Sequence, residues 1–240
     1  MPNHITNIIE ITDAGDVSLE DIRKVFLNDD NKIDFNVIYK MPECLENFQP
    51  HSGVLSAASA IISASISNNP LLANLETSSL EGFSKEDKAL VRRAIANFNK
   101  CGYMYWYDWS NAGWGTKWNA YDQPEDGFPL DCTKFRFQTA WSHPYQLIEL
   151  IALKLPTVEF FIQFADEDLG SNCGNYKIKN NVTYEEGIAP PYREQTEEQK
   201  KHYIKLAFNL CNPGVDPASY GYDDRWVFDE EIESNYYRKN

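Results

Sequence analysis

The stretch that constrains the fold most is residues 133–166, because its hydrophobic period changes twice. Residues 133–141 (TKFRFQTAW) alternate apolar and polar side chains, which is typical of a strand with one buried face. Residues 142–156 (SHPYQLIELIALKLP) follow a helical period, with Ser142 as the expected N-cap. Residues 157–166 (TVEFFIQFAD) form an apolar run that indicates a central strand. We therefore predict the order strand, helix, strand.

The N-terminal part of the chain predicts a matching arrangement. Residues 4–12 (HITNIIEIT) are rich in β-branched side chains and indicate a strand. Residues 18–28 (SLEDIRKVFLN) place apolar side chains on one face of a helix that begins at a serine cap. Residues 32–42 (KIDFNVIYKMP) indicate a second strand. The full order, β-α-β…β-α-β, predicts the α+β fold class: a ferredoxin-like split β-α-β antiparallel sheet with helices on one face.

A helical segment interrupts this frame. It contains two predicted helices separated by Asn69-Pro70, and the second begins at a Ser84-x-x-Asp87 capping box. After the frame, the sequence predicts a hairpin about Asn180-Asn181, then a helix at 196–211 and an acidic tail. We expect three parts: a ferredoxin-like α+β domain of residues 1–43 and 105–190, a helical insertion at 44–104, and a C-terminal helix and acidic tail at 191–240.

The most unusual segment is residues 105–122, YWYDWSNAGWGTKWNAYD, which holds four of the six tryptophans. Its aromatic residues follow neither period for long, so the segment is not simply one face of a helix or strand. Residues 114–119 (WGTKWN) predict a glycine-bent loop that leads into a short strand, TKWNAY. Two interpretations stay open. The indoles could cover a seam between the insertion and the sheet, which we favour because each buries a large area. They could instead line a concave pocket. The candidate binding residues are Trp106, Asp108, Trp109, Trp114, Lys117, Trp118 and Asp122.

The sequence lacks the usual signatures of catalysis. It contains no phosphate-binding glycine loop, dinucleotide-binding fingerprint, zinc-protease motif or serine-hydrolase motif. The four histidines are far apart, and none has a second ligand at metal-binding spacing. The five cysteines are an odd number without a CxxC pair, which favours reduced thiols. We therefore expect neither an enzyme nor a metal or cofactor, and we assign no catalytic residue.

The acidic composition narrows the class of partner. The formal net charge is −14, from 36 acidic and 22 basic residues. This charge repels nucleic-acid phosphates and anionic membranes, so direct nucleic-acid binding is disfavoured and a basic protein partner is favoured. We find no stretch that could span a bilayer and no signal peptide, and we expect a cytoplasmic protein. The expected acidic partner surface comprises Asp223, Asp224, Asp229, Glu230 and Glu231.

Several landmarks occur along the chain: the opening MPNHITN, an MPE after the second predicted strand, the aromatic segment, FQTAWSHP and FADEDLGSNCGNY. Together they resemble the Api92-like proteins of phages, prophages and conjugative plasmids. The resemblance runs through residues 1–185 and implies a ferredoxin-like domain encoded by a mobile element. It implies no catalytic mechanism. His143 departs from the pattern, in which we expect a proline or a small residue before Pro144.

These observations predict an accessory protein of a mobile element that binds a protein of its bacterial host. An acidic surface can occupy the nucleic-acid-binding face of a defence component, so we expect a counter-defence inhibitor of the anti-restriction or anti-CRISPR type. Two other classes stay open. A small-molecule or nucleotide-binding enzyme would use the aromatic segment as its pocket, with Asp108, Lys117 or Asp122 in polar roles. A single-stranded nucleic-acid binder would use the exposed face of the sheet, which the net charge disfavours.

Overall fold

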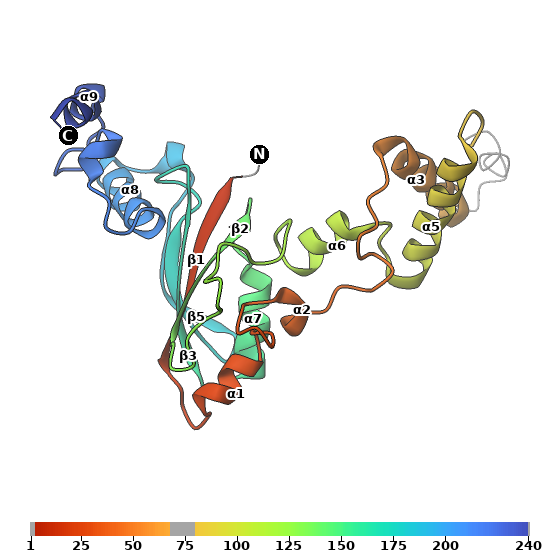
Figure 1. The fold of residues 1–240 in the computed structure, drawn as a ribbon, viewed down its shortest axis with the longest axis horizontal. Coiled ribbons are helices and arrows are strands. Elements are labelled where there is room, and N and C mark those ends of the chain that lie inside the picture. The colour runs from red at the N-terminus through yellow and green to blue at the C-terminus, as the bar shows by residue number, and fades with distance from the viewer. Residues whose placement is uncertain (1–2, 68–79, 240) are drawn as a thin grey trace. The chain divides into compact units, whose positions relative to one another are not determined.

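The computed structural model describes residues 3–67 and 80–239, which divide into two compact units (Figure 1). The α+β unit consists of residues 1–39 and 114–240, and the helical unit of residues 40–113. The helical unit is wider at both ends than the insertion expected from the sequence. It also takes in the first half of the aromatic segment, which forms a helix of its own.

The α+β unit contains five antiparallel strands in the order β2-β1-β3-β4-β5. Their bounds are β1 His4–Asp13, β2 Lys134–Ala140, β3 Glu159–Asp166, β4 Gly174–Lys179 and β5 Val182–Ile188. Strands β2 and β3 both run antiparallel to β1, which lies between them. Helix α7 (Tyr145–Lys154) connects β2 to β3. This is a split β-α-β unit, and it confirms the predicted α+β, ferredoxin-like fold.

Helices cover both faces of the sheet at β1. In Figure 1, α1 (Leu19–Lys24) and α7 lie on one side of the sheet and α8 (Glu197–Cys211) on the other. Helix α8 packs its apolar residues against Ile8 and Ala165, which are neighbours on one face. The alternate residues of β1, such as Ile5 and Ile9, are buried on the opposite face. The central strand is therefore apolar on both sides.

The strand predicted at 32–42 is wrong. In its place are a single bridge between Leu27 and Ile33 and the short helix α2 (Phe35–Ile38). Asp34 caps this helix with its side chain, and the first and last residues of α2 are both buried. A short apolar segment fits either period, and here the buried side chains are three residues apart, as in a helix.

Other predicted elements are present in the structure, although their ends and caps differ in places. Ser18 caps α1 by accepting a hydrogen bond from the Asp21 amide at 3.1 Å, although the helix ends at Lys24, four residues early. Asn180 and Asn181 both have positive φ, 49° and 58°, as a type I′ hairpin turn requires. Ser142 is not the cap of α7, because Pro144 occupies that position without a side-chain hydrogen bond.

The helical unit contains α3 (Ser52–Ser67), α5 (Lys85–Cys101) and α6 (Trp106–Gly113). Ser84 caps α5 by accepting from the Asp87 amide at 3.0 Å, as its sequence predicts. The break predicted at Asn69-Pro70 lies outside the described residues. A core of small apolar side chains from α3 and α5, together with Phe48 from the segment before α3, joins the two helices: Val54, Ala57, Ala58, Val91 and Ala94.

The C-terminal segment packs on α8. This segment, residues 212–240, contains the 3-10 turn η3 (Pro217–Tyr220) and ends in α9 (Glu230–Lys239), whereas the 3-10 turn η2 (Tyr192–Glu194) comes before α8. The fully buried Phe208 of α8 is surrounded by three rings of this segment, whose centroids lie 5.4 to 6.2 Å away: Tyr220, Tyr222 and Trp226. The segment is therefore folded around one aromatic side chain. Across the described part of the chain, no helix has the length and hydropathy that a membrane crossing needs.

Candidate functional site

The candidate residues of the aromatic segment belong to different units. Trp106, Asp108 and Trp109 lie in α6 of the helical unit. The sequence did not predict this helix, whereas the glycine-bent loop predicted at 114–119 is present, with Gly115 at a φ of 73°. The remaining four residues belong to the α+β unit: Trp114, Lys117, Trp118 and Asp122.

Trp114 supports the fold of the α+β unit. It is 4% exposed, its ring meets that of Phe35 edge-on at 5.7 Å, and its indole N–H donates to the carbonyl of Tyr39 at 2.9 Å. The indole thus holds both ends of α2. The strand predicted at TKWNAY is reduced to one bridge, between Tyr121 and Gln138, on the free edge of β2.

The other three residues of this half lie nearer the surface. The ammonium of Lys117 is 4.6 Å from the centre of the Trp118 ring, which is a cation–π contact, and Trp118 is 37% exposed. The carboxylate of Asp122 pairs with Arg136 at 3.3 Å. These contacts are made between neighbours on the same part of the sheet edge.

In the helical unit, Trp109 is 4% exposed and Trp106 meets Tyr107 edge-on at 5.7 Å. Asp108 borders an open depression of about 520 Å³ between α6 and α3. Burial raises the pKa of the Asp108 carboxyl, and a hydrogen bond from Tyr105 opposes this. The lining residues are Leu55, Ser56, Ser59, Ala60, Met104, Tyr105 and Asp108.

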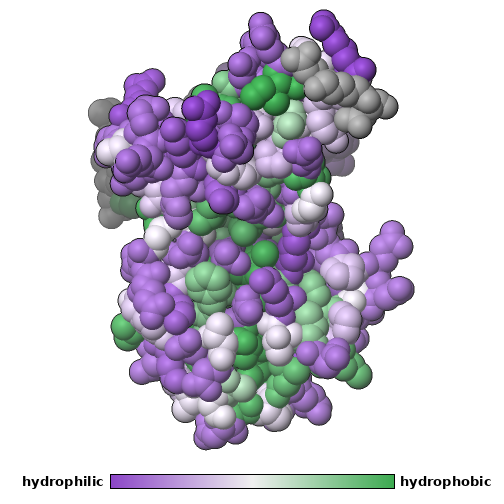
Figure 2. Space-filling model, turned by 90° about the vertical axis from the view of Figure 1, so that its left-hand side faces the viewer, coloured by the Kyte–Doolittle hydropathy of each residue, from purple (hydrophilic) through white to green (hydrophobic). Residues whose placement is uncertain are grey.

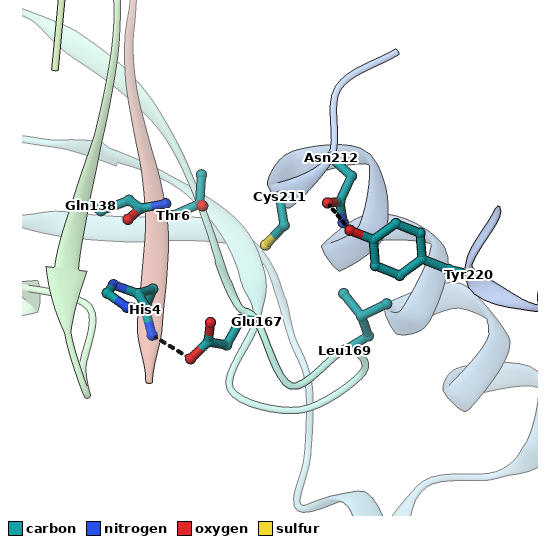
Figure 3. Close-up of a pocket in the computed structure, with 8 residues that line it drawn as sticks. All are labelled: His4, Thr6, Gln138, Glu167, Leu169, Cys211, Asn212 and Tyr220. Atoms are coloured by element: carbon teal, nitrogen blue, oxygen red, sulfur yellow. Dashed lines mark hydrogen bonds between the residues drawn. The ribbon is translucent and has the colours of Figure 1, made fainter. Parts of the chain in front are cut away.

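A second cavity, of about 460 Å³, lies between the sheet and the end of α8 (Figure 3). Strands β1 and β2 provide one wall, the loop after β3 a second, and the end of α8 with η3 the third. Its lining is mixed polar and apolar: His4, Thr6, Gln138, Glu167, Leu169, Cys211, Asn212 and Tyr220. We call it the His4 cavity. None of the seven candidate residues of the aromatic segment lines it.

Hydrogen bonds fix the tautomer of His4. The Tyr121 hydroxyl donates to the carbonyl of Thr139 at 3.0 Å and lies 2.7 Å from Nδ1 of His4. Because a hydroxyl has one proton to donate, Nδ1 of His4 must carry a hydrogen and donate to Tyr121. Burial raises the pKa of Tyr121 to about 12, which keeps the phenol protonated. With the hydrogen on Nδ1, the neutral tautomer of His4 has Nε2 as its hydrogen-bond acceptor.

The other polar groups of the His4 cavity suit binding better than nucleophilic chemistry. Glu167 accepts from the backbone amide of His4 at 3.1 Å, and Tyr220 donates to the side chain of Asn212 at 3.3 Å. The thiol of Cys211 faces the carbonyls of Ala165 and Asp166 at 3.7 and 3.6 Å, and burial raises its pKa. A thiol with a raised pKa is a weak nucleophile at neutral pH.

A buried polar network lies on the opposite face of the sheet. Nδ1 of His143 donates to Oδ1 of Asn7 at 2.7 Å, and Nε2 accepts from the Tyr176 hydroxyl at 2.7 Å. Asn7 donates in turn to Thr139 at 2.9 Å, and the imidazole stacks on Phe164 at 4.4 Å. Burial lowers the pKa of His143 to about 3. With every ring nitrogen paired, the network joins the start of α7 to the sheet.

The predicted acidic surface is divided between structural and exposed carboxylates. Asp223 accepts from the amides of Arg225 and Val227 at 2.9 and 2.8 Å, and these bonds lower its pKa. Asp229 accepts from the amide of Glu231 at 2.9 Å at the start of α9. Asp224, Glu230 and Glu231 are exposed. The side of the molecule that carries α8 and α9 is largely hydrophilic, with separate hydrophobic areas between (Figure 2).

Basic side chains of β2 and β4 lie on the part of the sheet face that α8 leaves uncovered. Each of them is paired with a carboxylate. The N···O distances range from 3.0 to 3.3 Å. The pairs are Lys134 with Glu10, Arg136 with Asp122, Lys177 with Glu185 and Lys179 with Asp13. The positive charge of this face is therefore largely balanced.

No three His, Cys, Asp or Glu side chains converge on a possible metal position within residues 3–67 and 80–239. The residues of the His4 cavity were missed at the sequence level. They come from four separate segments, and only the packing of the end of α8 on the sheet brings them together. His4 carried no local signal, because it is one polar residue at the start of an apolar strand.

Residues 114–206 match the family model described as the ferredoxin-like domain in Api92-like proteins. The match begins at Trp114 and ends within α8, so it includes β2 to β5 and α7. It confirms the family resemblance for these residues. None of the curated proteins and none of the solved structures compared with the chain matches it.

Proposed function

We propose that this chain, whose residues 114–206 form the ferredoxin-like domain of an Api92-like protein, is a non-enzymatic accessory protein of a mobile element that binds a basic host protein. The resemblance to proteins of phages and plasmids supports the mobile-element origin and a place in the cytoplasm of a bacterial host. The observation that carries the binding function is the surface of the C-terminal segment.

This C-terminal surface combines exposed apolar side chains with excess negative charge. Residues 212–240 contain seven acidic and three basic residues. Five large apolar side chains of the same segment are at least 42% exposed: Val215, Tyr220, Val227, Phe228 and Tyr237. Exposed apolar and aromatic groups among charged ones are typical of protein interfaces, where the apolar groups supply affinity and the charges guide association.

The chemistry of this surface supports a counter-defence role. A host protein that binds DNA or RNA presents a basic face, and the exposed carboxylates of Asp224, Glu230 and Glu231 complement such a face. A protein that occupies it excludes the nucleic acid. An inhibitor of a restriction or CRISPR component fits this description without any catalytic step.

Affinity purification from host lysate tests the proposal. The full chain should recover a stoichiometric basic partner at physiological salt, and that partner should dissociate steeply as salt rises, because charge pairs at an interface rim are screened. Added DNA or RNA should compete with the chain for the partner. Recovery of no stoichiometric partner, or of one indifferent to nucleic acid, would contradict the counter-defence role.

Direct nucleic-acid binding has weaker support. The four cations of the sheet face already have carboxylate partners, so a phosphate would have to displace them. A gel-shift titration with single-stranded DNA and RNA at low salt should therefore stay flat.

The His4 cavity favours a second candidate function, the binding of a small amine. Its polar groups include the acceptors His4 Nε2 and the Glu167 carboxylate, and its lining contains no lysine or arginine among the residues described. Arg136, nearby on β2, is paired with Asp122. Leu169 and the ring of Tyr220 supply an apolar wall, so an aromatic or alkyl amine fits the lining.

A thermal-shift comparison of tyramine with phenylacetate distinguishes this candidate. Tyramine at 100 times its dissociation constant should add about 2.7 kcal/mol to the free energy of unfolding, and phenylacetate should add nothing. Glu167→Gln, which keeps an acceptor for the His4 amide, should remove the shift, whereas Glu125→Gln on the exposed surface should not. Equal shifts with the amine and the acid would rule out the assignment.

A further inference from the structure

Two thiols of the helical unit lie side by side although 57 positions separate them in the chain. Cys101 is the last residue of α5, and Cys44 lies in the segment before α3. Their sulfur atoms are 4.0 Å apart. A disulfide requires about 2.05 Å, so a movement of about 1 Å by each sulfur would reach bonding distance. Both residues are partly exposed, which leaves the pair accessible to a small oxidant.

Contacts on one face of α5 hold the two thiols in this position. The guanidinium of Arg93 lies 4.3 Å from the centre of the Phe48 ring and donates to the carbonyl of Cys44 at 3.4 Å. Arg93, Asn97 and Cys101 are spaced by four and share this face. The thiol of Cys101 donates to the carbonyl of Asn97 at 3.2 Å. The segment that carries Cys44 is thus already attached to α5 before any covalent bond forms.

We propose that Cys44 and Cys101 are a redox modification site, at which hydrogen peroxide converts the two thiols into an intramolecular disulfide. The Cys44 sulfur attacks the peroxide O–O bond, and forms a sulfenic acid and one water. The Cys101 sulfur then displaces the sulfenic oxygen, and forms the S–S bond and a second water. Two thiols lose two electrons and two protons, and one peroxide is reduced to two waters.

The order of the two steps follows from the surroundings of the thiols. Burial raises the pKa of Cys101, which makes it the slower nucleophile toward peroxide. The other cysteines whose pKa is perturbed lie in the α+β unit. Cys173 is fully buried, and its pKa is raised to about 12. Cys173 and Cys211 should therefore react with peroxide more slowly than Cys44.

Peptide mass spectrometry of the full chain tests the proposal. The protein is treated with hydrogen peroxide, remaining thiols are alkylated, and the unreduced digest is searched for the peptide pair that joins Cys44 to Cys101. We expect a linked pair about 2 Da lighter than the sum of the two peptides, which dithiothreitol separates. Cys132→Ser should leave the link intact. In Cys101→Ser, which retains a donor for the Asn97 carbonyl, dimedone should trap a sulfenic acid on Cys44.

Hydrogen exchange provides a second readout that needs no variant. The amides of α5 should exchange several-fold more slowly after oxidation, because the disulfide closes a long loop in the unfolded chain. The proposal is overturned if both thiols remain open to alkylation after peroxide treatment. It is also overturned if the link forms only between chains, or if dimedone labels Cys44 equally in the wild type and in Cys101→Ser.

Discussion

The imidazole of His143 stays neutral at pH values at which an exposed histidine would take up a proton. Its pKa is lowered to about 3, while that of an unfolded chain stays near 6.5. Between these two values the unfolded state binds a proton that the folded state does not. The free energy of unfolding should therefore fall as pH decreases below about 6.5, by up to about 1.4 kcal/mol per pH unit.

Urea unfolding at pH 7 and pH 5 measures this effect. His143→Gln should lower stability at pH 7, because the network with Asn7 and Tyr176 is disturbed, but it should flatten the pH dependence. His202→Gln, at an exposed histidine of α8, should leave both unchanged. A slope that survives in His143→Gln would show that the network is not its source.

The tryptophans of the aromatic segment should differ in their effect on stability. Trp114→Ala removes a buried ring and its hydrogen bond to Tyr39, and should lower the free energy of unfolding by about 3–5 kcal/mol. Trp118→Ala removes a ring that is 37% exposed, and should cost about 1 kcal/mol or less. Chemical denaturation checks both. Equal losses would contradict the assignment of the larger structural role to Trp114 over Trp118.

Among the elements, the hairpin between β4 and β5 gives the sharpest test of local sequence control. Asn181 has a φ of 58°, a conformation that glycine adopts freely and a β-branched residue resists. Asn181→Gly should change stability by less than about 0.5 kcal/mol, and Asn181→Val should lower it by about 1–2 kcal/mol. Thermal unfolding of the two variants, compared with the wild type, decides whether this turn has the predicted geometry.

Sequence patterns correctly predicted helices whose apolar period runs over at least two turns. They also predicted strands in which apolar and polar residues alternate over at least four residues. Strand β2 followed its alternation of Phe135 and Phe137 with polar neighbours, and α8 (Glu197–Cys211) matches the helix predicted at 196–211. The patterns failed at α2 and α6. Both helices are short, and in α2 the ring of Phe35 packs against the distant rings of Trp114 and Phe137, which no local period records.

At the scale of the whole molecule, the candidate sites were harder to predict than the fold. The aromatic segment is contiguous in sequence, yet the boundary between the two units falls at Trp114 and separates its residues. The His4 cavity shows the opposite case, since Glu167 and Cys211 meet His4 only because α8 packs across the sheet. The excess of acidic residues near the C-terminus could be predicted from composition. The structural role of Asp223 and Asp229, which accept hydrogen bonds from backbone amides in turns, could not.

The central claim, that the exposed carboxylates of the C-terminal surface bind a basic host protein, concerns charge on one part of the molecule. Asp224→Asn, Glu230→Gln and Glu231→Gln together remove three charges and leave the hydrogen bonds of Asp223 and Asp229 in place. Glu125→Gln, Asp126→Asn and Asp131→Asn remove three exposed charges elsewhere in the α+β unit and serve as the matched control.

Affinity purification with the wild type and the two triple variants in parallel, over a series of salt concentrations, tests this claim most directly. The C-terminal variant should recover at least about tenfold less of the salt-sensitive partner, equivalent to about 1.4 kcal/mol of binding free energy, while the control retains wild-type recovery. Equal recovery by both variants would contradict the claim, because the location of the charge would then not matter.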